Sequence, residues 1–407
     1  MPADFDVPPG EDADAAHRTW TQLRARCPVA HTDALGGFWA LTRHADVARV
    51  AADHTRYTTT VQNVVPKVAF TGRRPPLHLD PPDQTPYRAA LNPLLSAERV
   101  ARLAPAVRAI VAEAWAPLIA RGGGDLCGEF SARFPVRVFG HWMNLDGALE
   151  AQLMQSGPAF IQAVQAFDTD AMRGTSLVLY DMARTLVAAR RADPRPADED
   201  PVSALLATRV DGQPLPDEMV VGTVRQVLVV GIVAPMVMVG SIGRHLAQHP
   251  ELHDQLRAQP ALRPAAVEEF LRLYTPYRGF ARTPRSDVEL GGRPIRAGEP
   301  LALTYASANR DEAVFDDPHT FRLDRPNIGE HLAFGRGAHY CAGAHLARLE
   351  LAVALDALVD GCARITLDGE ARWCPYPEIG PYALPVRLQA DAARGTVATA
   401  GTVTPAA

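Results

Sequence analysis

Paired cysteines are missing from this chain of 407 residues. The cysteines are odd in number, scattered and without a C-x-x-C pair, at positions Cys27, Cys127, Cys341, Cys362 and Cys374. This usage argues against a disulfide framework and fits a reducing compartment. The chain also lacks a P-loop, a Rossmann glycine fingerprint and clustered cysteines, so no fused flavin or iron–sulfur domain is expected.

A signal sequence is equally absent, because the first 17 residues are acidic and proline-containing, with no apolar core. The uninterrupted apolar stretch 227–240 is too short to span a membrane, so it predicts a buried helix. The formal net charge of −5 gives no reason to expect nucleic acid or an anionic membrane as a partner. We therefore expect a soluble, cytoplasmic protein.

Hydrophobic periodicity predicts a mainly α fold with minor β. The clearest predicted helices are 97–121, 265–273 and 344–360, and the predicted strands are 37–42, 287–290 and 300–304. Because no repeat or linker divides the chain, we expect one domain over residues 15–390. Segments 1–14 and 391–407 have little to bury and are expected to be disordered.

One cysteine stands out, because Cys341 lies between a glycine-rich turn and an amphipathic helical pattern. A helix N-terminus favours the thiolate, which is the form of cysteine that binds metals. Gly335, Gly337 and Gly343 allow the backbone to pass close to a flat, bulky group. The stretch therefore suits a thiolate-ligated haem.

The residues Phe334, Gly337, His339, Cys341 and Gly343, at these intervals, resemble the haem-binding signature of the cytochrome P450 superfamily. The resemblance covers about residues 15 to 390 and implies the cytochrome P450 fold. It makes Cys341 the axial ligand of a haem b iron, with the rest of the signature around the haem.

Two alternatives remain for this stretch. The cysteine could be a buried structural thiol, or it could bind zinc together with His331, His339 and His345. Neither explains a phenylalanine and three glycines around one thiol, and zinc sites of this type usually show paired ligands.

The resemblance also implies contacts with the haem propionates. The family usually has a histidine and, four residues later, an arginine where this chain has Gln84 and Arg88. Arg88 can pair with a carboxylate, whereas Gln84 can donate only a neutral hydrogen bond. By the same resemblance Arg282 binds a propionate. Glu269 and Arg272 match the ExxR motif, and with Arg325 they are expected to steady the cysteine loop.

The distal helix departs from the family pattern. Residues 230–235 read VGIVAP where the family has Ala/Gly-Gly-x-Asp/Glu-Thr-Thr. Gly231 matches, but Val233 replaces the acid and Ala234 the alcohol that manage proton delivery. Pro235 is predicted to kink the helix and leave the Gly231 carbonyl unpaired.

Substrate-pocket residues follow only from the resemblance. The candidates are Phe70, Phe160, Phe167, Val227, Val230, Arg278, Phe280 and Ile379. For Arg278 we favour a side chain that points to solvent, the alternative being an anchor for an acidic substrate group.

The resemblance implies a monooxygenase that hydroxylates or O-dealkylates a small organic substrate with O₂. Two electrons would come from a separate ferredoxin and ferredoxin reductase. The missing acid and alcohol leave two alternatives open: a peroxide-driven peroxygenase, and a non-catalytic haem protein that acts as a sensor or scavenger.

Overall fold

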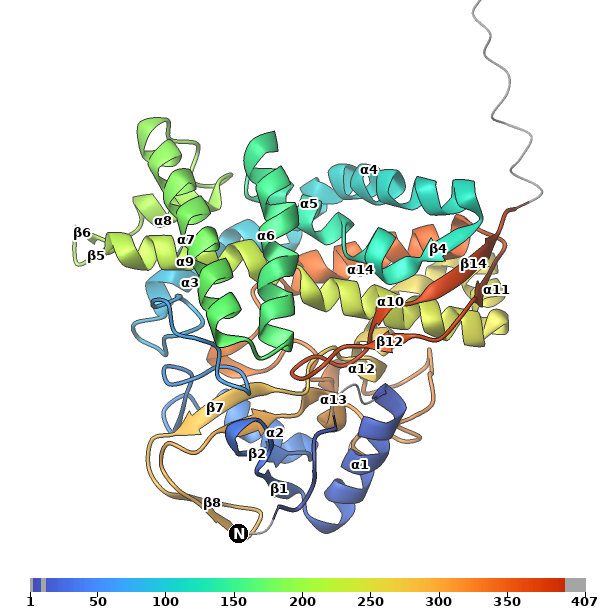
Figure 1. Ribbon diagram of the computed structural model, residues 1–407, viewed down its shortest axis with the longest axis horizontal. Helices are drawn as coiled ribbons and strands as arrows, with labels where there is room; N and C mark the ends of the chain where they lie inside the picture. The colour runs from blue at the N-terminus through green and yellow to red at the C-terminus, as the bar shows by residue number, and fades with distance from the viewer. Residues whose placement is uncertain (1–2, 9–11, 392–407) are drawn as a thin grey trace, which may run out of the picture.

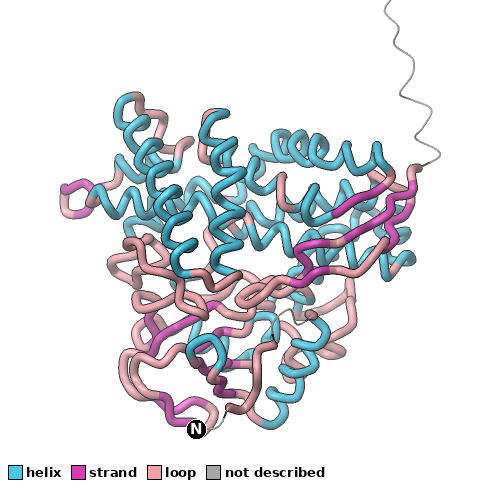
Figure 2. The backbone as a smooth tube through the Cα atoms, in the orientation of Figure 1, coloured by secondary structure: helices cyan, strands magenta, loops and turns pink. Residues whose placement is uncertain are grey.

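The computed structural model describes residues 3–8 and 12–391. Most helices gather in the upper part of Figure 1, and the largest sheet lies below them beside α1. The helices are α1 Ala13–Arg26, α2 His44–Ala52, α3 Thr85–Leu91, α4 Ala97–Arg121, α5 Phe134–Trp142, α6 Gly147–Gln165, α7 Thr169–Ala192, α8 Pro201–Ala207, α9 Asp217–Val230, α10 Val233–Gln248, α11 Pro250–Ala258, α12 Arg263–Leu273, α13 Tyr305–Ala308 and α14 Ala344–Asp360. The tube in Figure 2 shows how strongly helix outweighs strand, which confirms the predicted class.

The largest sheet has five strands in the order β1-β2-β10-β7-β3. Strand β10 runs parallel to β2 and antiparallel to β7, so Ala302 lies between Ala40 and Ala281. The small side chains of this row let both faces of the central strands be covered, and both strands are buried throughout. The strands are β1 Val29–Thr32, β2 Phe38–Leu41, β3 Tyr57–Thr58, β4 Gly123–Asp125, β5 Arg209–Val210, β6 Gln213–Pro214, β7 Phe280–Pro284, β8 Val288–Leu290, β9 Arg293–Ile295, β10 Leu301–Leu303, β11 Arg364–Leu367, β12 Arg372–Trp373, β13 Pro381–Ala383 and β14 Pro385–Gln389.

Helix α14 anchors the helical layer, because it packs against α4, α10 and α12 together. Its apolar residues are correspondingly spread around the helix, among them Leu346, Leu351, Leu355 and Leu358, which are all buried. The cysteine loop enters α14 at its N-terminus, so the core fixes where that loop ends.

The predicted elements agree with the structure except at two places. The apolar segment forms two helices, α9 and α10, instead of one. Near the N-terminus, part of the segment expected to be disordered is bound to the fold: Asp4 lies 3.0 Å from Arg293 and accepts a hydrogen bond from the His31 amide. The sequence prediction is therefore wrong for residues 3–8 and for residues 13–14, which begin α1. The predicted disordered tail lies outside the described residues from position 392 onward.

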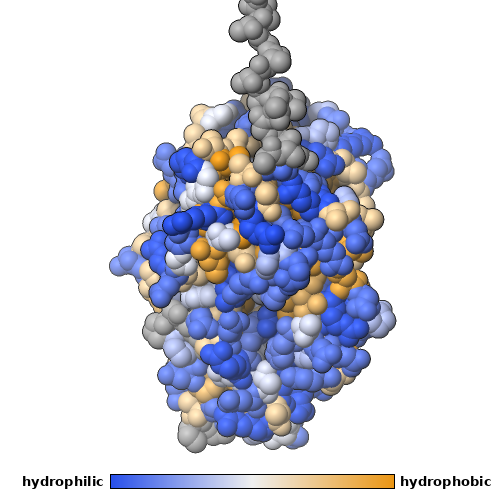
Figure 3. All heavy atoms as spheres, turned by 90° about the vertical axis from the view of Figure 1, so that its right-hand side faces the viewer, coloured by the Kyte–Doolittle hydropathy of each residue, from blue (hydrophilic) through white to orange (hydrophobic). Residues whose placement is uncertain are grey.

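Two described helical stretches, Ala97–Arg121 and Asp217–Gln248, are long and apolar enough to cross a membrane by length and composition. The second is mostly buried inside the protein, as a core helix is. The face shown in Figure 3 is largely hydrophilic, with scattered apolar groups. Helix length and composition alone are weak support for a membrane span.

Glu350 is an acid in the core of α14. It is buried, and neither carboxyl oxygen has a hydrogen-bond partner in the described structure. Burial raises its pKa well above the ordinary value. The side chain is therefore held neutral, and folding must keep the proton on it.

We predict that Glu350→Met stabilises the protein by about 1–3 kcal/mol, because an apolar side chain removes an unsatisfied polar group. The folded-state pKa lies above the unfolded one, so the wild type loses stability as pH rises above the unfolded value. The gain should therefore be larger at pH 8 than at pH 5.5, as measured by unfolding midpoints. Glu218→Met, at an exposed position of α9, is the control and should show no such pH dependence.

Candidate active site

The loop before α14 is shaped by glycines and ends on Cys341. Gly335 and Gly337 have φ of +70° and +74°. A Cβ at Gly337 would lie 2.7 Å from the backbone of Ala52, so a larger residue cannot fit. The Cys341 amide donates to the Phe334 carbonyl at 2.9 Å, which closes the loop around the phenylalanine.

Cys341 lies at the end of this loop as an exposed residue. The residue retains accessible surface, yet burial among protein atoms raises the pKa of its thiol. The Gly343 amide and the guanidinium of Arg88 act in the opposite direction. The Gly343 amide therefore favours the thiolate, as expected of this helix end, although burial outweighs it.

The zinc alternative finds no support in the part of the chain that the structure describes, where no three ligand residues are grouped. His331 is bound to Glu268 at 3.0 Å, and His339 to Asp80 at 3.3 Å.

Polar groups predicted to meet a haem gather beside the cysteine loop. Gln84 Nε2 lies 3.0 Å from His339 Nδ1, and Arg88 Nη2 donates to the Tyr340 carbonyl at 2.8 Å. Burial raises the pKa of Asp80, but its bonds to His339 and Thr58 outweigh this and lower it. The structure thus brings Gln84, Arg88 and His339 together.

Arg282, in β7, is buried and lies within electrostatic reach of Asp80 and His339. Its Nη1 donates to the Ala281 carbonyl at 3.0 Å, but its buried Nε has no partner in the described structure. An orphaned guanidinium N–H is a donor suited to a carboxylate such as a haem propionate.

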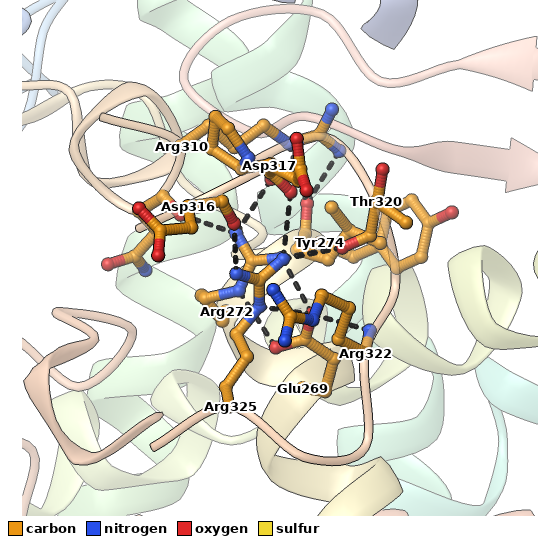
Figure 4. A network of polar contacts seen from close by, with 12 residues as sticks. Glu269, Arg272, Tyr274, Arg310, Asp316, Asp317, Thr320, Arg322 and Arg325 are labelled. Carbon is orange, nitrogen blue, oxygen red and sulfur yellow. Dashed lines mark hydrogen bonds and ion pairs between the residues drawn. The ribbon is translucent and has the colours of Figure 1, made fainter. Parts of the chain in front are cut away.

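Glu269, Arg272 and Arg325 form the buried network that the sequence predicts (Figure 4). Glu269 Oε1 lies 2.7 Å from Arg272 Nη2 and 2.8 Å from Arg325 Nε. Arg272 Nη1 also donates to the carbonyls of Asn309 and Pro318 at 2.8 Å each. One buried carboxylate and several carbonyls therefore satisfy two guanidinium groups.

The distal helix is interrupted, which corrects the predicted kink. Helix α9 ends at Val230 and α10 begins at Val233, so Pro235 lies in the first turn of a new helix, where no amide donor is needed. A Cβ at Gly231 would lie 1.6 Å from the Phe139 ring, which packs into the break. Val233 is buried and Ala234 half-buried, and neither carries a transferable proton. That the Gly231 carbonyl is unpaired stays a prediction.

The candidate substrate-pocket residues differ in how far their side chains are exposed. Val230 remains accessible at the end of a buried helix, and Phe280 is half-buried. Phe70 and Phe167 are exposed, Phe160 and Val227 are buried, and Ile379 packs with Ala16 and Trp20 beneath α1. The placement of Ile379 does not support its predicted contact with substrate.

The preference for Arg278 pointing to solvent is wrong. The side chain is buried, and its Nε donates to the Glu378 carbonyl at 2.9 Å. Burial raises the pKa of Glu378 to about 7, against the opposing effects of Gln165 and Arg278. Tyr277 bridges to Glu378 through the backbone and lies within electrostatic reach of Cys341. Sequence reasoning missed Tyr277 and Glu378, because neither belongs to a motif.

Comparison with known proteins decides the family. A cytochrome P450 family model matches residues 241–373. Cyclomarin C epoxidase CymV of Salinispora arenicola is 31% identical over 362 residues, 87% of this chain and 90% of that protein. Cytochrome P450 107B1 of Saccharopolyspora erythraea is 30% identical over 366 residues, 86% and 88% of the two. The structure of cytochrome P450 CYP109Q5 from Chondromyces apiculatus matches with a TM-score of 0.82 at 28% identity, over 92% and 96%. This chain belongs to the cytochrome P450 family.

The protein is accordingly a P450 monooxygenase, an oxidoreductase with a haem-thiolate iron. The residues fit that cofactor: an accessible cysteine, glycines that admit a flat group, and the guanidinium of Arg88 within electrostatic reach of the thiol. When bound, a thiolate-ligated haem activates dioxygen for insertion of one oxygen atom into a substrate.

We predict that Arg272→Lys in this P450 lowers both the unfolding midpoint and the haem content. Lysine keeps the charge but lacks the fork that serves Glu269 and two carbonyls, and breaking a buried pair costs about 3–5 kcal/mol. Haem content is measured as Soret absorbance relative to protein. The control Arg322→Lys changes a side chain that pairs only with Asp324 at the surface, at 3.2 Å, and should leave both unchanged. Equal effects of the two variants would contradict a structural role for the buried network.

Proposed function

We propose that this P450 hydroxylates or O-dealkylates a small organic substrate, with haem b held by Cys341. The observation that carries the proposal is the accessible Cys341 at the end of a loop closed onto Phe334. Gln84, Arg88, Arg282 and His339 are the groups that would bind the propionates.

We further propose that the electrons come from a separate ferredoxin and ferredoxin reductase, in the cytoplasm and without membrane attachment. Arg336 is exposed on the cysteine loop, and Arg88 lies beside it against Tyr340. Together they give the proximal face a positive charge that an acidic ferredoxin would complement.

Peroxide use is a second candidate, because the α9–α10 break carries Val233 and Ala234 where a proton relay needs an acid and an alcohol. A peroxide already brings both oxygen atoms and the electrons, so its use depends less on a proton relay at the α9–α10 break. A sensor or scavenger role has weaker support, since the curated relatives include enzymes named epoxidase, hydroxylase and monooxygenase.

The first test is the reduced protein under carbon monoxide. Wild type should show the red-shifted absorption of a thiolate-ligated haem, and Cys341→Ala should lose it because the axial sulfur is gone. Cys27→Ala is the control, since this thiol lies by β1 and Arg293, and it should keep the band. Retention of the band in Cys341→Ala would overturn the assignment of the ligand.

The second test addresses the missing alcohol. A substrate is first chosen from a compound panel by its shift of the Soret band. With ferredoxin and reductase, Ala234→Thr should raise the fraction of electrons that end in product, and it should lower turnover with peroxide alone. General acid–base groups typically contribute about 10²–10⁴ in rate, so the effect should be measurable.

Ala247→Thr makes the same change near the far end of α10 and serves as the matched control. Turnover only with redox partners supports the monooxygenase, and turnover only with peroxide supports the second candidate. Identical coupling in wild type and Ala234→Thr would show that the missing alcohol is irrelevant.

A further inference from the structure

Two buried arginines, one in α9 and one in the loop before α3, have no acidic partner in the described structure. Arg225, in α9, has none of its surface exposed, and Arg74, in the loop before α3, has 6% exposed. Neither makes an ion pair in the described structure, whereas the buried Arg190, Arg272 and Arg325 each bond a carboxylate. A buried guanidinium without a counter-ion is expensive, so its presence calls for an explanation.

The surroundings of Arg225 satisfy only part of its fork. Its Nη2 donates to Ser176 Oγ at 2.8 Å, and its Cζ lies 4.3 Å from the centre of the Phe160 ring. Its Nε and Nη1 are buried without a hydrogen-bond partner. Burial, with the charge of Arg74, lowers the pKa of Arg225 to about 9. Two donors are thus directed at nothing that the described chain supplies.

Arg74 connects this position to an open hollow. It lines a hollow together with Asn63, Lys67, Phe70 and His78. Its Nη2 lies 3.1 Å from His78 Nε2, and its own Nε is buried without a partner. Burial lowers the pKa of Arg74 to about 10. Burial and the nearby arginines lower the pKa of His78 to about 3, so His78 is neutral and offers no negative charge.

No described carboxylate lies close enough to either guanidinium to influence it. The charged or polar groups that act on Arg225 are Arg74 and Tyr180, and Tyr180 also acts on Arg74. Lys67 adds further positive charge at the hollow. The charge here is therefore of one sign, in a place where water is largely excluded.

The position relative to the haem site defines how far a ligand must reach. Arg225 precedes Gly231 by six residues, which corresponds to about 9 Å along a helix axis. Figure 1 shows the elements that meet here: α6 and α7 cross over α9, and the loop before α3 closes the side. A molecule with a reactive end at the α9–α10 break and its other end near Arg225 would need a chain of about seven or eight atoms.

We propose that Arg74 and Arg225 form an anion-binding subsite for the carboxylate of an organic acid substrate, whose other end reaches the α9–α10 break. The proposal rests on the proposed monooxygenase function and adds the chemical class of its substrate. A carboxylate accepts from both free N–H groups of Arg225 or from Arg74, and it neutralises charge in a place of low dielectric, where the gain is large.

The test compares octanoate with octanamide, which share the alkyl chain and differ in the charged or neutral head group, by isothermal titration calorimetry on the holoenzyme. Octanoate should bind at least tenfold more tightly than octanamide. Arg225→Gln and Arg74→Gln should each weaken octanoate at least tenfold and leave octanamide within about twofold. Arg184→Gln is the matched control, because this arginine of α7 is exposed and already paired with Asp181 at 2.6 Å. It should change neither affinity.

Inorganic phosphate is titrated in parallel, to separate a substrate carboxylate from a free anion. Octanoate binding no tighter than octanamide, complete absence of binding included, would overturn the subsite. So would an octanoate affinity unchanged in both arginine variants, or phosphate binding as tight as that of octanoate. Each protein is also checked for its thiolate–haem absorption under carbon monoxide. Intact absorption with no preference for the acid refutes the subsite alone, whereas missing absorption in wild type refutes the proposed function.

Discussion

A single buried carboxylate, that of Glu269, governs the proximal half of this protein. It holds Arg272 and Arg325 at 2.7 and 2.8 Å, and Arg272 in turn fixes the carbonyl of Asn309. The Asn309 side chain accepts from the Leu332 amide at 2.6 Å, and the Leu332 carbonyl accepts from Gly335. A continuous chain of bonds therefore runs from the acid of α12 to the loop that ends on Cys341. Because the acid is fully desolvated, no water can replace a lost link at low cost.

The distal wall is governed by a proline. Pro235 cannot donate to the carbonyl four residues before it, and that carbonyl belongs to Gly231, the place where α9 stops. The Phe139 ring occupies the notch beside Gly231, so a side chain there would clash. The helix break, the packing of Phe139 and the missing acid and alcohol therefore all fall within residues 231–235. Any proton that reaches this wall must come from water or from the substrate.

The sequence predicts those parts of the site that belong to motifs with a fixed residue spacing. Cys341 with its glycines, the Glu269–Arg272 pair and the helices 97–121 and 344–360 follow from local pattern, and the structure places them as expected. The solvent-facing Arg278 was wrong, and the kink predicted at Pro235 is a complete break between α9 and α10. Both outcomes depend on partners distant in sequence, and at the break that partner is Phe139. Arg278 is buried by the segment around Glu378, a hundred residues later. Neither Arg74 nor Arg225 belongs to a motif, and only the folded chain shows that no acid approaches them.

The missing acid and alcohol of the distal helix and the proposed anion-binding subsite affect each other. A substrate could carry its own proton donor to the α9–α10 break, but a carboxylate held at Arg225 would lie about 9 Å away along α9. The same anchor that selects an organic acid therefore withdraws that acid from proton delivery. Under the proposed subsite, water is the remaining carrier at the break, unless peroxide replaces dioxygen. A carboxylate bound at Arg74 and Arg225 also places one negative charge beside two buried guanidinium groups, so substrate binding relieves part of the buried charge.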